Sequence, residues 1–378
     1  MKTSETYAFS TIYTGQGIVH RGFLKIIDGS IEELGEAPRN SIDLTDRIAV
    51  PGFIDIHTHG INGIDSFNLT KTELLEWSQL LLERGTLGFV PTIVSAPIEK
   101  IKGFLGVLKS SEGSENGAEI IGGRMEGPFI SHVRKGAHDP SLLRVPANTN
   151  FQAILSQFKG ILKIVDIAPE LDGAGELISE LVREDVVVSI GHTDCDSVTA
   201  KRAFALGATL VTHLYNAMRP FHHRFPGAID FALLEKNVMA EIICDLVHVS
   251  PEAIKLAISN KGAKRIVLIT DSTPATGRPD GKYKLGRLDV LKQGDKCTIS
   301  GTETLAGSVL TMDRAVKNLV DLKYDLDEVV KMSSKNPATL LGRKDLGSIK
   351  KGKKANITIL DKSLRVRGVV SRGALIEF

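Results

Sequence analysis

Eight short apolar runs, separated by stretches of helical periodicity, fill the middle of this 378-residue chain. Near-continuous apolar runs of this length are typical of parallel strands buried on both faces, joined by crossover helices. Eight such units are the number that closes a (β/α)8 barrel. The sequence therefore predicts a barrel with strands over residues 48–56, 88–94, 120–125, 162–168, 186–190, 209–212, 239–244 and 265–270.

The stretches between the runs repeat apolar residues at the i, i+3, i+4 spacing of an amphipathic helix. The first of them, residues 72–84, is followed by Gly85, a typical residue just after a helix C-terminus. Residues 175–183, 197–206 and 251–259 have the same pattern. Beyond the eighth run, the pattern predicts a loop over residues 272–286 and helices over residues 308–322 and 326–341.

Both ends of the chain have a β-rich pattern with glycine turns, at residues 6–13 and 23–31 and again at 355–360 and 365–371. We expect the two ends to pair in one accessory sheet, forming a small β-sandwich. The predicted division is an accessory domain of residues 1–49 and 346–378 and a barrel domain of residues 50–345.

Composition narrows the range of partners. The net charge of +2 argues against nucleic acid, and no apolar run approaches the roughly 18 residues of a membrane span or a signal peptide pattern. Cys195, Cys244 and Cys297 are widely spaced and odd in number, which favours a reducing, cytoplasmic compartment over a disulfide framework. The chain has no glycine-rich nucleotide-binding motif.

Potential metal ligands follow several of the predicted strands, at the point where each strand ends. Barrel enzymes carry their chemistry at this face, and imidazole and carboxylate groups suit divalent ions such as zinc and iron. One histidine at a strand end is more often structural, but the occurrence of such residues at the ends of several strands indicates a metal site. The residues are His57, His59, Glu126, His192, His213, Asp245, His248 and Asp271.

Their chemistry points to hydrolysis. The alternation in His57-Thr58-His59 puts both rings on one face of an extended strand, where they can share an ion. A bound divalent ion lowers the pKa of water from about 15.7 to about 7 and polarises a carbonyl, the two tasks of amide hydrolysis. Asp271, at the end of the eighth run, is placed to accept and return the proton, although the Ser-Thr-Pro after it would equally suit a turn.

Longer motifs carry a resemblance that spans nearly the whole chain. PGFIDIHTHG resembles the first-strand signature of the amidohydrolase superfamily. A narrower set occurs in the order found in the N-acetylglucosamine-6-phosphate deacetylases: EGPFIS, KGAHDP, GHTD, THLYNAM, ICDLVHV, LITDSTPATG, TLAGS and the closing GSIKKGKKANITILD. The chain thus resembles that family of metal-dependent hydrolases.

The resemblance assigns roles to matching positions. It implies that Glu126, His192 and His213 bind the main metal, that Asp271 is the catalytic acid/base, and that His138 lies beside the acetyl carbonyl. Arg224 is the implied phosphate partner, since a guanidinium matches phosphate oxygens. Family members are usually dimers, and residues 222–224 are expected to reach a neighbouring subunit's site. The implied substrate pocket comprises Ala137, Asn216, Ala217, Arg224, His248, Leu305, Ala306 and Gly307.

The sequence is compatible with one or two metal ions and with more than one function. Some family members replace the first-strand histidines and bind one metal, whereas this chain keeps His57 and His59, so one or two ions, zinc or iron, are expected. Because Glu170 stands where many binuclear relatives carry a lysine, Glu126 would have to bridge the two ions.

Alternative functions are an amidohydrolase for a related N-acyl amino sugar or a cyclic amide, and an inert barrel used for assembly. Arg224 favours the phosphosugar, and a nucleophilic role for Cys195 is unnecessary beside an activated water.

Overall fold

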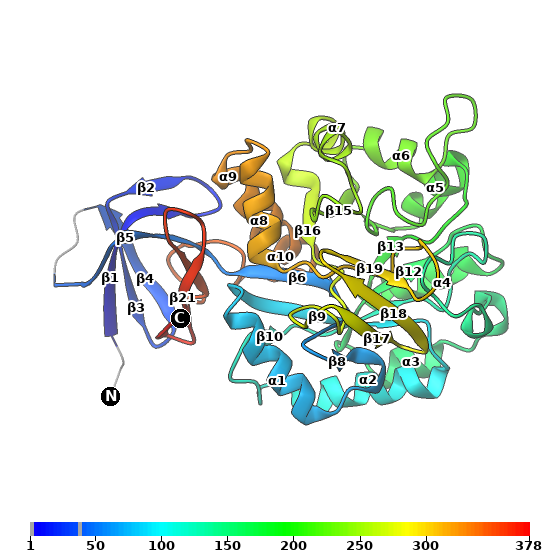
Figure 1. Ribbon diagram of the computed structural model, residues 1–378, viewed down its shortest axis with the longest axis horizontal. Helices are drawn as coiled ribbons and strands as arrows, with labels where there is room; N and C mark the ends of the chain where they lie inside the picture. The colour runs from blue at the N-terminus through cyan, green and yellow to red at the C-terminus, as the bar shows by residue number, and fades with distance from the viewer. Residues whose placement is uncertain (1–3, 37–39) are drawn as a thin grey trace.

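The computed structural model describes residues 4–36 and 40–378. Figure 1 shows a small sheet at the left, which contains both ends of the chain, and a larger barrel with surrounding helices at the right. Residues 1–3 and 37–39 of the predicted accessory domain lie outside the described residues. No helix in the described ranges has both the length and the apolar character needed to cross a membrane.

The barrel contains eight parallel strands, each at a predicted position. They pair in the order β6, β9, β11, β12, β13, β14, β15, β16, and the short β10 (Glu119–Ile120) extends the edge of β9. The ring closes where the Asp271 N–H donates to the His57 carbonyl (2.9 Å) and the His59 N–H donates to the Ser272 carbonyl (2.7 Å). The strands are β6 (Phe53–Thr58), β9 (Thr86–Val94), β11 (Gly123–Glu126), β12 (Leu162–Ile167), β13 (Val187–Ile190), β14 (Leu210–Val211), β15 (Met239–Ile243) and β16 (Ile266–Ile269).

Helices cover the outside of the barrel. The first begins with a capping box in which the Thr70 hydroxyl accepts from the Glu73 N–H and the Glu73 carboxylate accepts from the Thr70 N–H. It ends before Gly85, which has a φ of +68° as predicted for a residue after a helix. The helices are α1 (Lys71–Leu82), α2 (Ile98–Ser111), α3 (Gln152–Gln157), α4 (Ala174–Arg183), α5 (Ser197–Ala205), α6 (Ala228–Leu234), α7 (Pro251–Lys261) and α8 (Met312–Asp321).

The last predicted helix, residues 326–341, is divided into three pieces. A single turn of π-helix, η5 (Lys331–Lys335), joins α9 (Leu326–Val330) to α10 (Asn336–Leu340). Pro337 has no N–H to donate to the carbonyl four residues earlier, which weakens the α-helical hydrogen-bond pattern at this point. Two short strands, β7 (Gly60–Ile61) and β8 (Ile64–Asp65), pair in a small sheet of their own. Four 3-10 turns connect other elements: η1 (Ser66–Asn68), η2 (Pro140–Leu142), η3 (Pro146–Asn148) and η4 (Ala263–Arg265).

The accessory domain joins the two ends of the chain, as expected. Its strands form one hydrogen-bonded sheet in the order β22, β21, β20, β5, β1, β3, β4, with β2 paired to β1. Tyr7, Phe9, Leu24 and Ile357 are buried in its core. The strands are β1 (Ser4–Tyr13), β2 (Ile18–His20), β3 (Gly22–Ile27), β4 (Ser30–Glu36), β5 (Ile42–Pro51), β20 (Ile357–Leu360), β21 (Val366–Ser371) and β22 (Ala374–Glu377).

The loop predicted over residues 272–286 is wrong in its second half. Residues 281–299 form a three-stranded antiparallel sheet of β17 (Gly281–Leu285), β18 (Leu288–Gln293) and β19 (Lys296–Ile299). In β17 only Tyr283 and Leu285 turn inward, while Lys282 and Lys284 are exposed. Two apolar positions are too few to be recognised as a strand. Figure 1 shows this sheet in yellow, drawn over the barrel.

Candidate active site

A cavity of about 360 Å³ lies at the C-terminal ends of the barrel strands. Parallel strands end at the same face of a barrel, so side chains from distant parts of the sequence meet there. Most of the predicted site residues line this cavity. The predicted site residues that line it are His59, Glu126, Ala137, His138, His192, His213, Asn216, Ala217, His248, Asp271, Leu305 and Gly307.

Glu126, the last residue of β11, lies at the centre of the histidines. Its Oε1 is 3.1 Å from the Nε2 of His192 and 3.0 Å from the Nε2 of His213. Its Oε2 is 3.2 Å from the Nε2 of His59 and 3.3 Å from the Nε2 of His138. Burial alone would raise the pKa of Glu126, but the surrounding imidazoles hold it well below its usual range. One carboxylate therefore contacts rings from both sides of the site.

The orientation of three rings is fixed by acceptors behind them. The Nδ1 of His59 lies 2.9 Å from the Thr92 carbonyl, and the Nδ1 of His192 lies 2.9 Å from the Arg134 carbonyl. The Nδ1 of His57 lies 3.2 Å from the Glu241 carboxylate. Each of these partners only accepts, so Nδ1 carries the proton in the neutral ring and the Nε2 lone pair faces the site.

The donor atoms fit a divalent ion. The Nε2 atoms of His57 and His59 are 3.2 Å apart, and those of His192 and His213 are 3.1 Å apart. Two nitrogens bound at 2.0–2.1 Å to one zinc ion are separated by roughly 3.0–3.4 Å. Lone pairs facing each other at this distance repel unless a cation or a proton lies between them. The buried histidines and carboxylates are thus arranged as a metal site.

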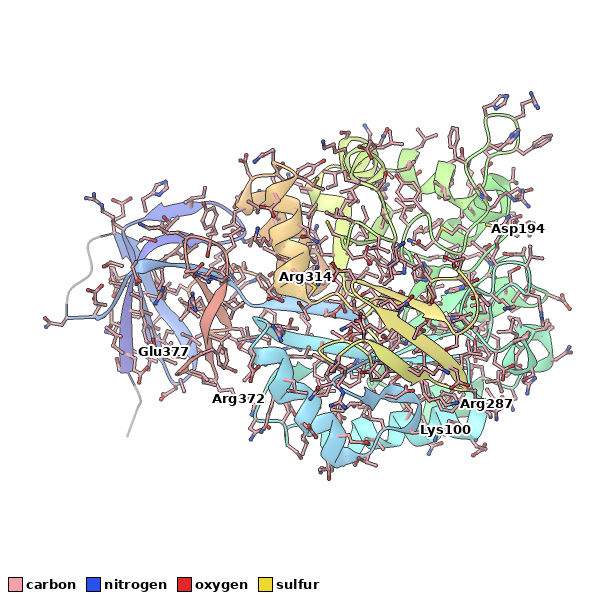
Figure 2. All side chains as sticks on the ribbon, in the orientation of Figure 1. Lys100, Asp194, Arg287, Arg314, Arg372 and Glu377 are labelled. Atoms are coloured by element: carbon pink, nitrogen blue, oxygen red, sulfur yellow. The ribbon has the colours of Figure 1, made fainter. Side chains whose placement is uncertain are left out.

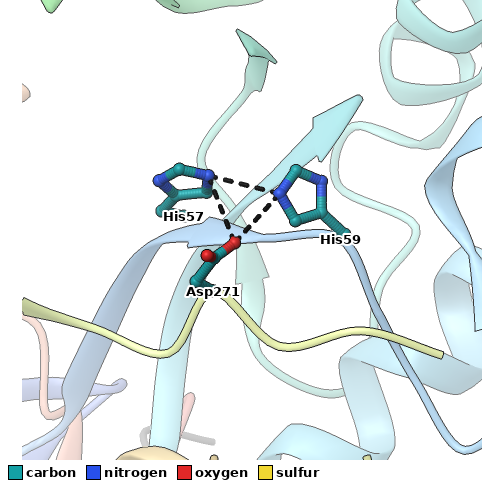
Figure 3. A group of neighbouring side chains, drawn as sticks. All are labelled: His57, His59 and Asp271. Carbon is teal, nitrogen blue, oxygen red and sulfur yellow. Dashed lines mark hydrogen bonds and ion pairs between the residues drawn. The ribbon is translucent and has the colours of Figure 1, made fainter. Parts of the chain in front are cut away.

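Figure 3 shows a second group of donors, His57, His59 and Asp271. Asp271, just after β16, places its Oδ1 3.1 Å from the Nε2 of His59 and 3.5 Å from the Nε2 of His57. The three side chains are buried and converge closely enough to hold one ion. Burial would raise the pKa of Asp271, but His57 and His59 outweigh it and lower the pKa to about 2. Asp271 is therefore held in its ionised, carboxylate form.

His138 is arranged differently from the other rings. The Ser95 backbone N–H donates to its Nδ1 (3.2 Å), so the proton of the neutral ring is on Nε2 and faces the site. Burial lowers the pKa of His138 to about 4, against the opposing effect of Glu126. His138 is thus a neutral hydrogen-bond donor, suited to polarise a carbonyl oxygen.

Several site residues have backbone conformations that side-chain-bearing residues rarely adopt. The φ angles of His192, His213, Ala217 and Asp271 are +47°, +25°, +48° and +51°. Such conformations cost roughly 1–3 kcal/mol each and cluster at functional sites, where the surrounding structure enforces them. The main chain is bent here so that these side chains can reach the cavity.

A further pair of residues orients a donor toward the cavity. The Nδ1 of His248 lies 2.7 Å from Asp245 Oδ2, and Asp245 Oδ1 also accepts the backbone N–H groups of Val247 and His248. Burial lowers the pKa of His248, but the Asp245 hydrogen bond outweighs it and raises the pKa above 6.5. His248 is thus a cationic or strongly donating group on the cavity wall.

The loop after β13 is tied down by two arginines. The Asp194 carboxylate, labelled at the right of Figure 2, accepts from Arg134 (2.8 Å) and Arg219 (3.2 Å). Glu170 stands where many binuclear relatives carry a lysine. Its carboxylate accepts from the Asp194 N–H (2.7 Å) and from the Thr193 hydroxyl. Since the Arg134 carbonyl orients His192, these contacts fix a ring of the metal site. Glu170 therefore stabilises the loop.

Two predicted pocket residues do not line the cavity. Ala306 is fully buried behind it, between Leu305 and Gly307. Arg224 is exposed on the loop between β14 and α6, next to Phe221 and Phe225, which are 66% and 64% exposed. Within residues 4–36 and 40–378, Arg224 is not among the residues that line the cavity. Sequence reasoning also missed five lining residues, Val94, Gly136, Leu285, Glu303 and Thr304, of which Leu285 belongs to the unpredicted sheet.

A (β/α)8 barrel whose strand ends bring histidines and carboxylates together in this geometry defines a metal-dependent hydrolase. Comparison with known families agrees. Residues 48–376 match the amidohydrolase family, and the chain belongs to that family.

The relatives are similar over almost the whole chain. An N-acetylglucosamine-6-phosphate deacetylase of Bacillus subtilis is 35% identical over 96% of this chain and 94% of its own length. An N-acetylgalactosamine-6-phosphate deacetylase of Escherichia coli is 34% identical over 97% of this chain and 98% of its own length. Among solved structures, an Asp-to-Ala variant of the N-acetylglucosamine-6-phosphate deacetylase of Mycobacterium smegmatis, bound to N-acetylglucosamine 6-phosphate, has a TM-score of 0.94 and 31% identity over the full length of both chains.

Proposed function

We propose that this amidohydrolase removes the acetyl group of N-acetylglucosamine 6-phosphate, giving glucosamine 6-phosphate and acetate. The observation that carries the proposal is the convergence of Glu126, His192 and His213 beside Asp271 and His138 in one cavity. The names of the relatives supply the substrate class, because the three described above are deacetylases of N-acetylhexosamine 6-phosphates.

The metal is held by residues of both donor groups. Glu126, His192 and His213 would hold the main ion, and His57 and His59, which also lie beside Glu126, would hold a second one. A divalent ion bound here supplies an acidified water as the nucleophile and Lewis acidity at the amide carbonyl. Neutral imidazole with carboxylate suits zinc or iron, and we propose one of these, as one or two ions per subunit.

The protein groups carry the proton and the developing charge. Asp271 is ionised and accepts the proton of the attacking water, then returns it to the leaving amine nitrogen. The Nε2–H of His138 donates to the acetyl oxygen, where negative charge develops in the transition state. The sugar pocket is lined by Ala137, Asn216, Ala217, His248, Leu305 and Gly307, and His248 can bind the hydroxyl groups of the sugar.

In the described part of the chain, no lysine or arginine lines the cavity, so the phosphate has no guanidinium or ammonium partner there. We assign that role to Arg224 of a second subunit, so that the enzyme is a homodimer in which the exposed 219–226 loop of one copy completes the site of the other. The exposed Phe221 and Phe225 side chains on that loop support a protein contact there. We also place the enzyme in the cytoplasm, since Cys195, Cys244 and Cys297 are all free thiols.

The E. coli relative makes N-acetylgalactosamine 6-phosphate a second candidate substrate. The two sugars differ in the configuration of one hydroxyl group. The test is acetate release from both phosphorylated sugars and from unphosphorylated N-acetylglucosamine. We expect the highest kcat/KM for N-acetylglucosamine 6-phosphate and a large loss without the phosphate. Faster release from the galactose epimer would reassign the substrate, and equal rates with and without phosphate would remove the role of Arg224.

A further inference from the structure

The interior of the barrel below the metal site contains three charged side chains that the proposed reaction does not use. Arg124 on β11, Asp166 on β12 and Glu241 on β15 are each fully buried. The Arg124 guanidinium donates to Asp166 (2.8 and 3.1 Å) and to both oxygens of Glu241. A buried ion network of this kind costs desolvation, and it is a poor source of stability.

Glu241 differs from Asp166 in what else it contacts. Its Oε2 lies 3.2 Å from the Nδ1 of His57 and accepts the backbone N–H of His213 at 3.2 Å. Asp166 accepts from Arg124 and from the Thr212 hydroxyl (2.8 Å), and in the described part of the chain it has no hydrogen bond to either histidine. Glu241 alone of the pair therefore forms hydrogen bonds to both donor groups, although an Asp166 oxygen lies within 4.8 Å of ligand atoms of His57 and Glu126.

The consequence for His57 follows from the hydrogen-bond chemistry. A carboxylate clamped by a guanidinium can only accept, so it requires the proton of the neutral His57 ring to be on Nδ1. The Nε2 lone pair then faces His59, Glu126 and Asp271, at 3.2, 3.3 and 3.5 Å. The same oxygen holds the main chain of His213, whose φ of +25° is strained.

We propose that Glu241, held in place by Arg124, is a positioning residue for the metal centre: it fixes the tautomer and direction of His57 and the backbone of His213. This inference rests on the proposed metal site. Carboxylate partners behind metal-binding histidines raise ligand basicity and fix the ring, and their loss weakens metal binding by about 10- to 100-fold. Arg124 acts one step further back, as the group that keeps Glu241 ionised and directed.

The test compares Glu241→Gln with Asp166→Asn, a matched control that also loses one charge beside Arg124. Each full-length protein is stripped with a chelator, and its zinc affinity is measured by competition with a chromophoric chelator, without substrate. We expect the zinc dissociation constant of Glu241→Gln to rise about 10- to 100-fold. Asp166→Asn should keep the wild-type value, although thermal unfolding of the stripped proteins should show destabilisation of both.

Equal zinc affinity in the two variants would overturn the inference, whatever their stability. If Glu241→Gln does not fold, nitrogen-15 NMR of the zinc-loaded wild-type protein decides the matter. A proton on the His57 Nδ1 is the expected result, and a proton on its Nε2 would contradict the proposal. Failure of the deacetylase proposal would be separate: zinc affinities that differ as predicted, in a protein that releases no acetate, would leave the role of Glu241 standing.

Discussion

The Nε2 atoms of His57 and His59 face each other at 3.2 Å, while a protein acceptor holds the Nδ1 of each ring from behind. Neither neutral ring has a proton to share at this contact, so the two lone pairs repel unless a positive charge lies between them. The Nε2 atoms of His192 and His213 also approach each other, to 3.1 Å, although in the described part of the chain only His192 has an acceptor at its Nδ1. The fold thus holds two close contacts between imidazole nitrogens at the mouth of the barrel, and a divalent cation bound there would satisfy both.

Replacing the proposed proton carrier should separate chemistry from metal binding. We expect Asp271→Asn to lower kcat by about 10²- to 10⁴-fold, because the amide cannot accept the proton of the nucleophile. The ligands Glu126, His192 and His213 are unchanged, so elemental analysis should find the main ion still bound. Undiminished turnover would mean that the proton is carried by another group.

The phosphate role of Arg224 can be isolated by comparing two substrates. Arg224→Met should raise KM for the phosphorylated sugar and leave the rate on unphosphorylated N-acetylglucosamine unchanged, since only the phosphate loses a partner. Arg21→Met, at an exposed turn of the accessory sheet, is the control and should affect neither. A loss on both sugars would indicate a structural effect of the loop.

The dimer can be tested with the same variant. If Arg224 acts across the subunit interface, mixing Arg224→Met with Asp271→Asn subunits creates hybrid dimers in which one site has both residues intact. Activity on the phosphorylated sugar should then exceed the sum of the two separate preparations. No gain, with subunit exchange shown by mass spectrometry, would place Arg224 in its own subunit's site.

The fold was readable from the sequence because barrel strands are buried on both faces. Each of the eight apolar runs contains a strand, and β9, for example, is buried along its whole length from Thr86 to Val94. The sheet β17 to β19 was missed because it is exposed on one face and alternates Lys282, Tyr283 and Lys284. A segment that packs on the barrel mouth has only a weak apolar pattern of its own.

The site was predictable in part. Strand ends of a parallel barrel meet at one face, so the ligands could be grouped without knowing any distance. The residues that hold these ligands in position could not be predicted from the sequence. Glu241 lies inside an apolar run, AEIIC, and only the coordinates show that it contacts His57 and Arg124. The exposed position of Arg224 was equally beyond a sequence pattern, because a loop's direction depends on the packing around it.

The pH dependence of substrate binding should follow His248. Asp245 raises the pKa of His248 above 6.5. The positive charge of His248, and its contribution to the stability of the folded protein, are therefore complete below about pH 6.5. Both are lost as the pH rises through the raised pKa. We expect KM for the phosphorylated sugar to rise on the alkaline side of that pKa. Asp245→Asn should move the rise to lower pH; an unchanged profile would remove His248 from substrate binding.

Two glycines with left-handed φ angles offer a matched test of the 305–307 segment. A Cβ on Gly307 would lie 2.6 Å from the Thr273 Cγ2 and 2.8 Å from the Asp271 carbonyl oxygen, whereas one on Gly301 would meet none of the described atoms within 4 Å. Gly301→Ala should cost about 1–2 kcal/mol of unfolding free energy. Gly307→Ala should cost about 1–3 kcal/mol more and lower kcat, because Asp271 is displaced. Equal losses in chemical denaturation would contradict the close packing at Asp271.

The central claim is that Glu126, His192 and His213 hold the cation on which hydrolysis depends. Its most direct test is acetate release from N-acetylglucosamine 6-phosphate by one preparation measured three times: as purified, after stripping with a chelator, and after zinc or iron is restored. We expect stripping to abolish turnover and the restored ion to return it, in proportion to the metal bound. A stripped enzyme, shown free of metal by elemental analysis, that hydrolyses substrate as fast as the restored one would contradict it.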